Sequence, residues 1–268
     1  TAQDHSALEE LAHEYIDFLS ICKTERESVT EAVRLAQEAG YLDLADIIAQ
    51  GTALKPGDRV YAVHMKKAVV LFHIGEAPLA QGMNILGAHI DTCRLDVKQN
   101  PLYEDSGLAY FDTHYYGGIK KYQWVTIPLA LHGVVVKKDG TTIQITLGER
   151  EEDPVFCVTD LLVHLSQDQL EKKASKVIEG EKLDILIGSI PLKKEDKESV
   201  KDGILSLLKE NYDITEEDFH SAELSLVPAG RARELGFDRS LILGYGQDDR
   251  VCSYTALRSM LCSSRCPT

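Results

Sequence analysis

Apolar residues recur at helical spacing over residues 1–40, and this periodicity predicts two helices. Thr24 and Glu27 occupy the two polar positions of a capping box that would start the second helix. Gly40 would end that helix, because glycine readily adopts the backbone conformation that follows a helix. The apolar face expected on the first helix consists of Leu8, Leu11, Ala12, Tyr15, Leu19 and Cys22.

Short apolar runs in the next part of the chain predict strands. Residues 59–64 and 68–74 would form two strands joined at Lys66-Lys67, and residues 84–90 would form a buried strand. Further elements are expected as a hairpin of 134–137 and 142–147 around Asp139-Gly140, a helix at 160–165, a loop at 171–182, strands at 184–191 and 223–228, a helix at 197–211, an apolar run at 240–246 and a helix at 251–261.

Strands alternate with helices at both ends of the chain, whereas the middle is rich in strands. This order predicts an α/β fold in which a second, β-rich domain is inserted between two parts of the first. The expected limits are 1–97 and 236–268 for the two parts, and 98–235 for the insertion. Tyrosines crowd into residues 103–124 together with Trp124, which suits either an interface or the core of the insertion.

The composition is that of an acidic folded protein. The 268 residues include 29 Lys and Arg against 43 Asp and Glu, giving a formal net charge of −14, and 44% are hydrophobic. This balance argues against a nucleic-acid partner and against an anionic membrane surface. No apolar run is long enough to span a membrane, and Thr1–His5 shows no secretory signal. We therefore expect a cytoplasmic location with reduced thiols on the six cysteines.

Two polar clusters directly follow apolar runs, where α/β proteins commonly place their sites. His89 and Asp91 would point to the same side of an extended segment, so the carboxylate could orient an imidazole that binds a metal. Adjacent Asp248 and Asp249 would repel each other unless a divalent cation or Arg250 relieved the repulsion. His-x-Asp is nevertheless a common pattern, and Asp-Asp-Arg before a helix is also a typical N-cap with an ion pair.

Other candidate residues give weaker signals. His132 lies among apolar residues and is expected to be structural. His164 lies in an apolar helical segment and is expected to be hydrogen-bonded within the fold or to lie at an interface. Cys93 and Cys252 lie close to the two polar clusters, but no activating histidine can be assigned to either. The chain contains no Walker loop, no Gly-x-Gly-x-x-Gly and no Gly-x-Ser-x-Gly.

Several segments occur together in an order that is specific to one family. They are Asp17-Phe18-Leu19-Ser20 through Lys23-Thr24-Glu25-Arg26-Glu27, Gly87-Ala88-His89-Ile90-Asp91-Thr92-Cys93-Arg94-Leu95-Asp96, Asn100-Pro101-Leu102-Tyr103-Glu104, Thr113-His114-Tyr115-Tyr116-Gly117-Gly118 and Gly244-Tyr245-Gly246-Gln247-Asp248-Asp249-Arg250-Val251-Cys252. In these segments the chain resembles the aspartyl aminopeptidase / aminopeptidase I family of dinuclear-zinc exopeptidases. The likeness extends from near the start to about Leu261.

The resemblance implies an α/β/α zinc-exopeptidase-like catalytic domain that hydrolyses N-terminal residues, acidic or apolar, from peptides with water activated by two Zn²⁺ ions. Mn²⁺ or Co²⁺ could replace zinc at such ligands. It implies that His89 binds one metal, that Asp91 orients His89, and that Asp248 bridges both metals. The Ala256-Leu257 register favours Asp248 over Asp249 as the bridge, and a cis peptide bond would join the two aspartates.

The resemblance also implies homo-oligomers. The inserted domain would dimerise and present His164 to the partner's active site, and dimers would assemble into tetrahedral dodecamers. The general base of the family is a glutamate in a Glu-Glu pair beyond the Asp-Asp-Arg helix. This chain ends at Cys262-Ser263-Ser264-Arg265-Cys266-Pro267-Thr268 without that pair and without the later metal ligands.

Three hypotheses account for the family resemblance together with the missing Glu-Glu pair. The leading one is the front part of a metal-dependent aminopeptidase. The alternative is a truncated, catalytically inactive assembly or dimerisation module of the same family. A related dinuclear aminopeptidase or deblocking enzyme would share Asp-Asp-Arg, but Thr113–Gly118 and Lys23–Glu27 argue against it.

Overall fold

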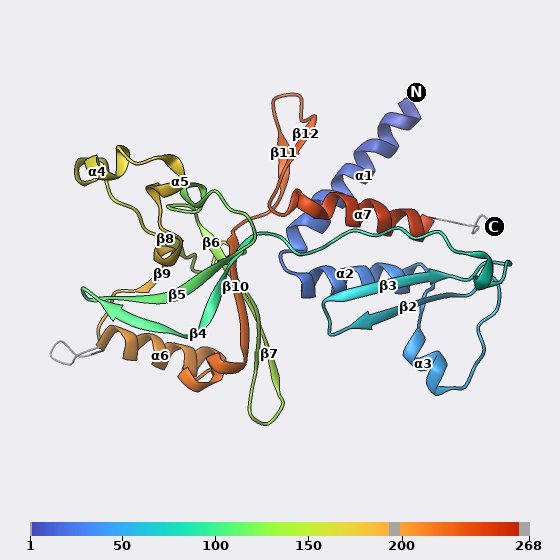
Figure 1. Cartoon of the computed structure of the whole chain (residues 1–268), viewed down its shortest axis with the longest axis horizontal. Helices are drawn as coiled ribbons and strands as arrows, with labels where there is room; N and C mark the ends of the chain where they lie inside the picture. The colour runs from blue at the N-terminus through green and yellow to red at the C-terminus, as the bar shows by residue number, and fades with distance from the viewer. Residues whose placement is uncertain (1, 193–198, 263–268) are drawn as a thin grey trace. The chain divides into compact units, whose positions relative to one another are not determined.

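The computed structural model describes residues 2–192 and 199–262 (Figure 1). The chain divides into two compact units by its internal contacts. The first unit combines the residues up to Thr92 with those from Arg231 onward, and the second unit comprises Cys93–Gly230. The mixture of helices and strands in both units is the α/β class that the sequence predicts.

The first unit contains helices and two small sheets. β1 pairs with β2 in parallel and β2 pairs with β3 antiparallel, whereas β11 and β12 form a separate antiparallel hairpin. The elements are α1 (Ala2–Ile21), α2 (Glu25–Glu38), β1 (Leu42–Asp43), α3 (Leu44–Ala49), β2 (Arg59–His64), β3 (Ala68–His73), η1 (Leu79–Gln81), β11 (Arg233–Leu235), β12 (Leu241–Leu243) and α7 (Gln247–Cys262).

Aromatic packing between α1 and α7 forms the core of the first unit. The rings of Tyr15 and Phe18 lie 5.1 and 5.0 Å from the ring of Tyr254 on α7. The predicted apolar face of α1 is buried only in its second half, because Leu8 and Leu11 are exposed. Helical periodicity identified the face correctly but not how much of it another element covers.

The start of α2 confirms the predicted capping box. The Thr24 side chain accepts from the backbone N–H of Glu27, and Glu27 Oε2 accepts from the backbone N–H of Thr24 at 2.9 Å. Gly40 lies just beyond the helix with φ +83°, a left-handed conformation that glycine adopts without strain. The predicted pair of strands, β2 and β3, is also confirmed.

The structure contradicts the buried strand that the sequence predicts at residues 84–90. The segment has no ladder to any strand among the described residues, and Ile85 and Leu86 are exposed. An apolar run becomes a buried strand only where a neighbouring strand satisfies its backbone polar groups and another layer covers its side chains. Neither condition is met in the part of the chain that the structure describes.

The second unit is built on one antiparallel seven-stranded sheet in the order β7-β6-β10-β4-β5-β9-β8. Figure 1 shows α6 lying against this sheet beside β4 and β5. The elements are β4 (Arg94–Asp105), β5 (Leu108–Tyr116), η2 (Lys121–Gln123), β6 (Leu129–Val136), β7 (Thr142–Leu147), β8 (Cys157–Val158), η3 (Val163–Leu165), α4 (Gln167–Leu170), α5 (Ala174–Val177), η4 (Gly180–Lys182), β9 (Ile185–Gly188), α6 (Ser199–Tyr212), η5 (Glu216–Ser221) and β10 (Ala222–Pro228).

Most predicted elements of the second unit are present. The hairpin of β6 and β7 and the strands β9 and β10 are confirmed. The helix expected at 160–165 is wrong, because only the short 3₁₀ turn η3 forms there, and the loop expected at 171–182 contains α5 and η4. The expected start of the helix at Lys197 lies outside the described residues, as do Cys266 and the rest of 263–268.

The described helices are all too short or too polar to cross a membrane. Within the described residues, Cys22, Cys93, Cys157, Cys252 and Cys262 are free thiols.

Candidate metal centre

Asp91, two residues after His89 in an extended segment, holds the His89 ring. Its Nδ1 lies 3.0 Å from Asp91 Oδ1 and 3.1 Å from the Asp91 carbonyl oxygen. The side chains of both residues are partly exposed. A carboxylate on one ring nitrogen fixes the plane of an imidazole and presents the other nitrogen as a potential ligand. In this segment, that free nitrogen is His89 Nε2.

Two carboxylates face His89 Nε2. The atom lies 3.2 Å from Asp248 Oδ1 and 3.8 Å from Asp249 Oδ2. Both aspartates stand at the start of α7, where their backbone angles are not helical, and the peptide bond between them is cis, as the resemblance implies. Residues far apart in sequence are thereby brought together, and all four residues of the two predicted clusters meet at one place.

The electrostatics of this cluster favour a cation at His89 Nε2. Partial burial lowers the pKa of His89, but the hydrogen bonds that its ring donates to Asp91 and the charges of Asp91 and Asp249 outweigh it, so the net pKa is raised. One imidazole nitrogen and nearby carboxylate oxygens are also the donor types that Zn²⁺ takes in proteins. The residues present therefore fit a divalent metal, with His89 and Asp248 as the nearest donors.

Among the described residues, Arg250 forms no ion pair with Asp248 or Asp249. Its side chain is fully buried, and Nη2 donates to the carbonyl oxygens of Lys23 at 3.0 Å and of Ile90 at 3.5 Å. Among the described residues, its Nε and Nη1 have no hydrogen-bond partner. A divalent cation is the other means by which the repulsion between Asp248 and Asp249 could be relieved.

A tight loop places Arg250 beneath the cluster. Gly246 has φ +85°, and a Cβ added there would lie 1.7 Å from Arg250 Nη1, so only glycine fits. The ring of Tyr245 lies 5.5 Å from the guanidinium and 5.8 Å from Nζ of the buried Lys23. Sequence reasoning missed this buried pair of cations, although both residues lie in segments that carry the family resemblance.

Gln247 ties the same loop to α1. Tyr15 Oη donates to Gln247 Oε1 at 2.7 Å, and Gln247 Nε2 donates to the carbonyl oxygen of Ile242 at 3.1 Å. Burial raises the pKa of Tyr15 to about 12, so the hydroxyl stays protonated as the donor. The loop that carries Asp248 and Asp249 is therefore fixed from both sides.

The thiol of Cys252, close to the second polar cluster, is not activated. A hydrogen bond to Asp249, followed by partial burial, raises the pKa of Cys252, which disfavours the thiolate. Cys93 belongs to the second unit, where its Sγ donates to the Gly118 carbonyl oxygen at 3.4 Å.

The two other histidines singled out by the sequence lie in the second unit. His132 is buried, with Nε2 3.0 Å from Glu149 Oε1, which confirms a structural role. His164 lies on η3 and is exposed, as are its neighbours Leu162, Val163 and Leu165. Its role toward another subunit stays a prediction.

Comparison with known proteins identifies the family. A family model described as aminopeptidase I zinc metalloprotease (M18) matches residues 18–267. The chain belongs to the M18 family. A probable M18 family aminopeptidase 1 of Clostridium acetobutylicum is 62% identical over 252 residues, covering 94% of this chain and 54% of that protein. One of Thermotoga maritima is 50% identical over 254 residues, covering 95% of this chain and 55% of that protein.

Solved structures of M18 proteins share the fold. The Thermotoga maritima M18 aminopeptidase matches with a TM-score of 0.90 at 49% identity, covering 97% of this chain and 56% of its own. Aminopeptidase I of Borrelia burgdorferi B31 matches with a TM-score of 0.87 at 38% identity, covering 100% and 61%. The S. cerevisiae mApe1 dodecamer matches with a TM-score of 0.70 at 17% identity, covering 96% and 56%, which shows the fold alone.

These matches confirm the zinc-exopeptidase-like α/β fold that the resemblance implied. The chain spans about half the length of the curated relatives it matches. The described cluster therefore belongs to one part of an M18 protein.

Proposed function

We propose that this chain forms the first part of a metal-dependent aminopeptidase, a hydrolase that removes N-terminal residues, acidic or apolar, from peptides. The observation that carries the proposal is the position of His89 Nε2. Asp91 holds the other ring nitrogen at 3.0 Å, and Asp248 Oδ1 lies 3.2 Å from Nε2. The relatives are named as probable M18 family aminopeptidases, which supports the same activity.

Each residue of the cluster has a distinct proposed role. Asp91 accepts the hydrogen bond from Nδ1–H of His89, so the ring keeps its orientation and Nε2 serves as the ligand atom. Asp248 has the nearer carboxylate and is largely exposed, so its two oxygens are available to bridge two cations. Asp249 is less exposed and lies farther from Nε2, which suits a supporting position.

The metal pair is proposed to be Zn²⁺, with Mn²⁺ or Co²⁺ able to occupy the same donors. When bound, such a pair would lower the pKa of a water molecule and polarise the scissile carbonyl group. The general base is a glutamate in the family that the chain resembles, and no residue here is assigned to it. We propose that the remaining part of the protein supplies that base and the later ligands, since catalytic zinc normally has three protein ligands.

The inserted domain, expected at 98–235, is proposed to mediate homo-oligomers. The observation that favours this is the exposed apolar surface around His164, formed by Leu162, Val163 and Leu165. The solved mApe1 assembly is a dodecamer, which makes dimers and a tetrahedral dodecamer the assemblies to test. His164 would then reach the active site of a neighbouring subunit. A cytoplasmic location is part of this proposal and agrees with the free thiols.

Activity of the complete gene product tests the catalytic proposal. It should release amino acids from unblocked peptides, lose activity when a chelator removes its metal, and regain activity with Zn²⁺. His89→Ala should abolish activity, whereas the exposed His64→Ala on β2 should leave it unchanged. Full activity of His89→Ala would exclude the site.

The second candidate function is a catalytically inactive assembly module. It predicts that the 268-residue chain is a dimer by light scattering without peptidase activity, and that Val163→Asp makes it monomeric. A monomeric wild-type chain would argue against this candidate, and peptidase activity of that chain would exclude it.

A further inference from the structure

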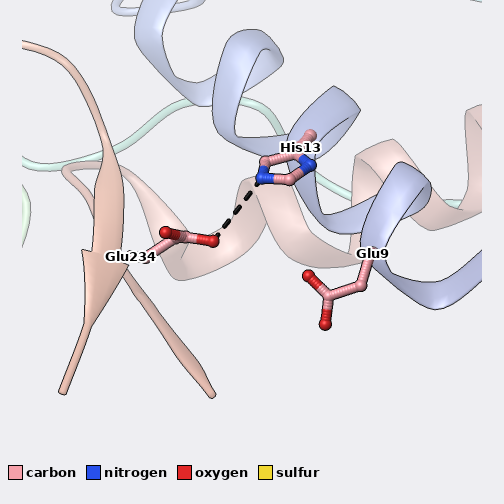
Figure 2. Close-up of side chains that lie close together, drawn as sticks. All are labelled: Glu9, His13 and Glu234. Atoms are coloured by element: carbon pink, nitrogen blue, oxygen red, sulfur yellow. Dashed lines mark ion pairs between the residues drawn. The ribbon is translucent and has the colours of Figure 1, made fainter. Parts of the chain in front are cut away.

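A second group of potential metal ligands lies on α1 and β11. Figure 2 shows the side chains of Glu9, His13 and Glu234 pointing toward a common space. His13 Nε2 lies 3.5 Å from Glu234 Oε1, and one ligand atom from each residue lies within 4.8 Å of the other two. None of the three residues belongs to the cluster around His89.

Contacts outside the group hold β11 against α1. Arg231 Nη2 donates to Asp17 Oδ1 at 2.5 Å, and the backbone N–H of Ala232 donates to Ser20 Oγ at 3.1 Å. Ala232 is buried in the apolar core together with Tyr15 of α1. The position of the strand over the helix therefore does not depend on the ion pair between His13 and Glu234.

The spacing of the donors suits a tetrahedral ion. Zn²⁺ binds nitrogen and oxygen at about 2.0–2.2 Å, which places neighbouring ligand atoms roughly 3.3–3.5 Å apart. His13 Nε2 and Glu234 Oε1 already lie at that separation. Glu9 stands four residues before His13 on the same face of α1, and its side chain is exposed.

Neighbouring basic side chains compensate part of the negative charge of the group. Glu9 and Glu234 bring two carboxylates to one imidazole, and further basic side chains already approach each carboxylate. Arg239 Nη1 lies 3.2 Å from Glu234 Oε2, which leaves Oε1 directed at His13. His5 Nδ1 lies 3.5 Å from Glu9 Oε1. A divalent ion at the centre would satisfy both carboxylates at once.

We propose that Glu9, His13 and Glu234 form a divalent-metal site, separate from the proposed catalytic centre, that binds Zn²⁺ with water completing the coordination. One histidine and two carboxylates from two elements suit zinc better than Mg²⁺, which prefers oxygen ligands alone. The ion links the β11–β12 hairpin to α1, so binding it should protect the hairpin from local opening.

Zinc titration of the 268-residue chain tests the site. Isothermal titration with Zn²⁺ in the presence of excess Mg²⁺ should detect this site in wild type and equally in His89→Ala, in which the proposed catalytic cluster has lost its imidazole. His13→Gln and Glu234→Gln should each weaken this binding event by more than about tenfold, since each removes one of three ligands. All three residues are at least partly exposed, so the variants should fold, which circular dichroism checks.

Matched substitutions separate a built site from general surface charge. Glu10→Gln removes one exposed carboxylate from the same helix, and His64→Gln removes an exposed imidazole from β2. Both should keep the zinc affinity of wild type. Loss of affinity in Glu10→Gln equal to that in Glu9→Gln would overturn the proposal, because binding would then follow net charge alone.

Hydrogen exchange gives a second readout that does not depend on counting ions. Adding Zn²⁺ to His89→Ala should slow amide exchange in the hairpin residues 233–243, and the slowing should vanish when His13→Gln is added. Unchanged stoichiometry and affinity in His13→Gln and Glu234→Gln, or equal protection of the hairpin with and without His13, would overturn the site.

Discussion

Arg250 donates a hydrogen bond of 3.0 Å to the backbone carbonyl oxygen of Lys23. The same Nη2 atom reaches the carbonyl oxygen of Ile90 at 3.5 Å. One buried side chain therefore joins the start of α7 to the segment before α2 and to the segment that carries His89. The loops bearing His89 and Asp248 are held together below the ligand atoms rather than only at them.

Replacing Arg250 should destabilise the first unit. Arg250→Ala removes a fully buried side chain, leaves a cavity and strips a donor from two carbonyl groups, so we expect a loss of about 3 kcal/mol in the free energy of unfolding. Urea denaturation measures it. Arg258→Ala on the same helix, which removes an ion pair of 2.9 Å with Glu14, should lose less than about 1 kcal/mol. Equal losses in both variants would contradict the argument.

Gly246→Ala should be almost as damaging for a different reason. The new Cβ would collide with Arg250 Nη1 at 1.7 Å, and φ +85° would be strained for alanine. We expect a loss of at least about 2 kcal/mol by urea denaturation. Gly57 has a similar φ of +91° but no atom within 4 Å of an added Cβ, so Gly57→Ala isolates the strain. Equal losses of stability in both variants would show that the collision with Arg250 does not contribute.

Asp91→Asn tests how His89 is oriented. Asparagine keeps an acceptor for Nδ1–H but removes the charge that makes the ring a better ligand. Zinc affinity and peptidase activity of the complete protein should fall by about 10–100-fold. Asp46→Asn, at an exposed position of α3, should change neither. Wild-type zinc affinity in Asp91→Asn would remove Asp91 from the proposed site.

Local features of the fold followed from the sequence, and features that depend on distant partners did not. The capping box of Thr24 and Glu27 needs only four consecutive residues, and the hairpin of β6 and β7 needs one Asp-Gly turn. The run 84–90 looked equally strand-like, but a strand also needs a neighbour, and none lies beside it within the described part.

The candidate site likewise has one part that the local sequence predicts and one part that depends on distant residues. Spacing alone suggested that His89 and Asp91 act together, because they lie two residues apart on an extended segment. Their approach to Asp248 depends on folding of the whole first unit, and in the sequence only the family resemblance brought them together. Glu9 and His13 show helical spacing, but nothing in the sequence around Glu234 predicts that it completes their group.

Asp184 of the second unit should make stability depend on pH. It is half-buried, Tyr103 Oη donates to its Oδ2 at 2.8 Å, and its Oδ1 is buried without a hydrogen-bond partner among the described residues. Burial, with the nearby charge of Asp112, raises the pKa of Asp184. The folded state therefore holds this proton more tightly than the unfolded state does. Stability decreases as the pH rises above the unfolded pKa of about 3.9, and the loss is complete above the folded pKa.

Asp184→Asn should remove this penalty while keeping an acceptor for Tyr103. We expect the Tm at pH 7 to rise by roughly 2 °C, because the group is only partly buried and the gain is correspondingly small. Near pH 3 the aspartate is neutral in both states, so the Tm difference from wild type should vanish. Thermal unfolding followed by circular dichroism at the two pH values measures both effects. Asp105→Asn, at the exposed end of β4, provides the control and should change Tm little at either pH. A Tm of Asp184→Asn below that of wild type at pH 7 would show that the charged carboxylate stabilises the fold.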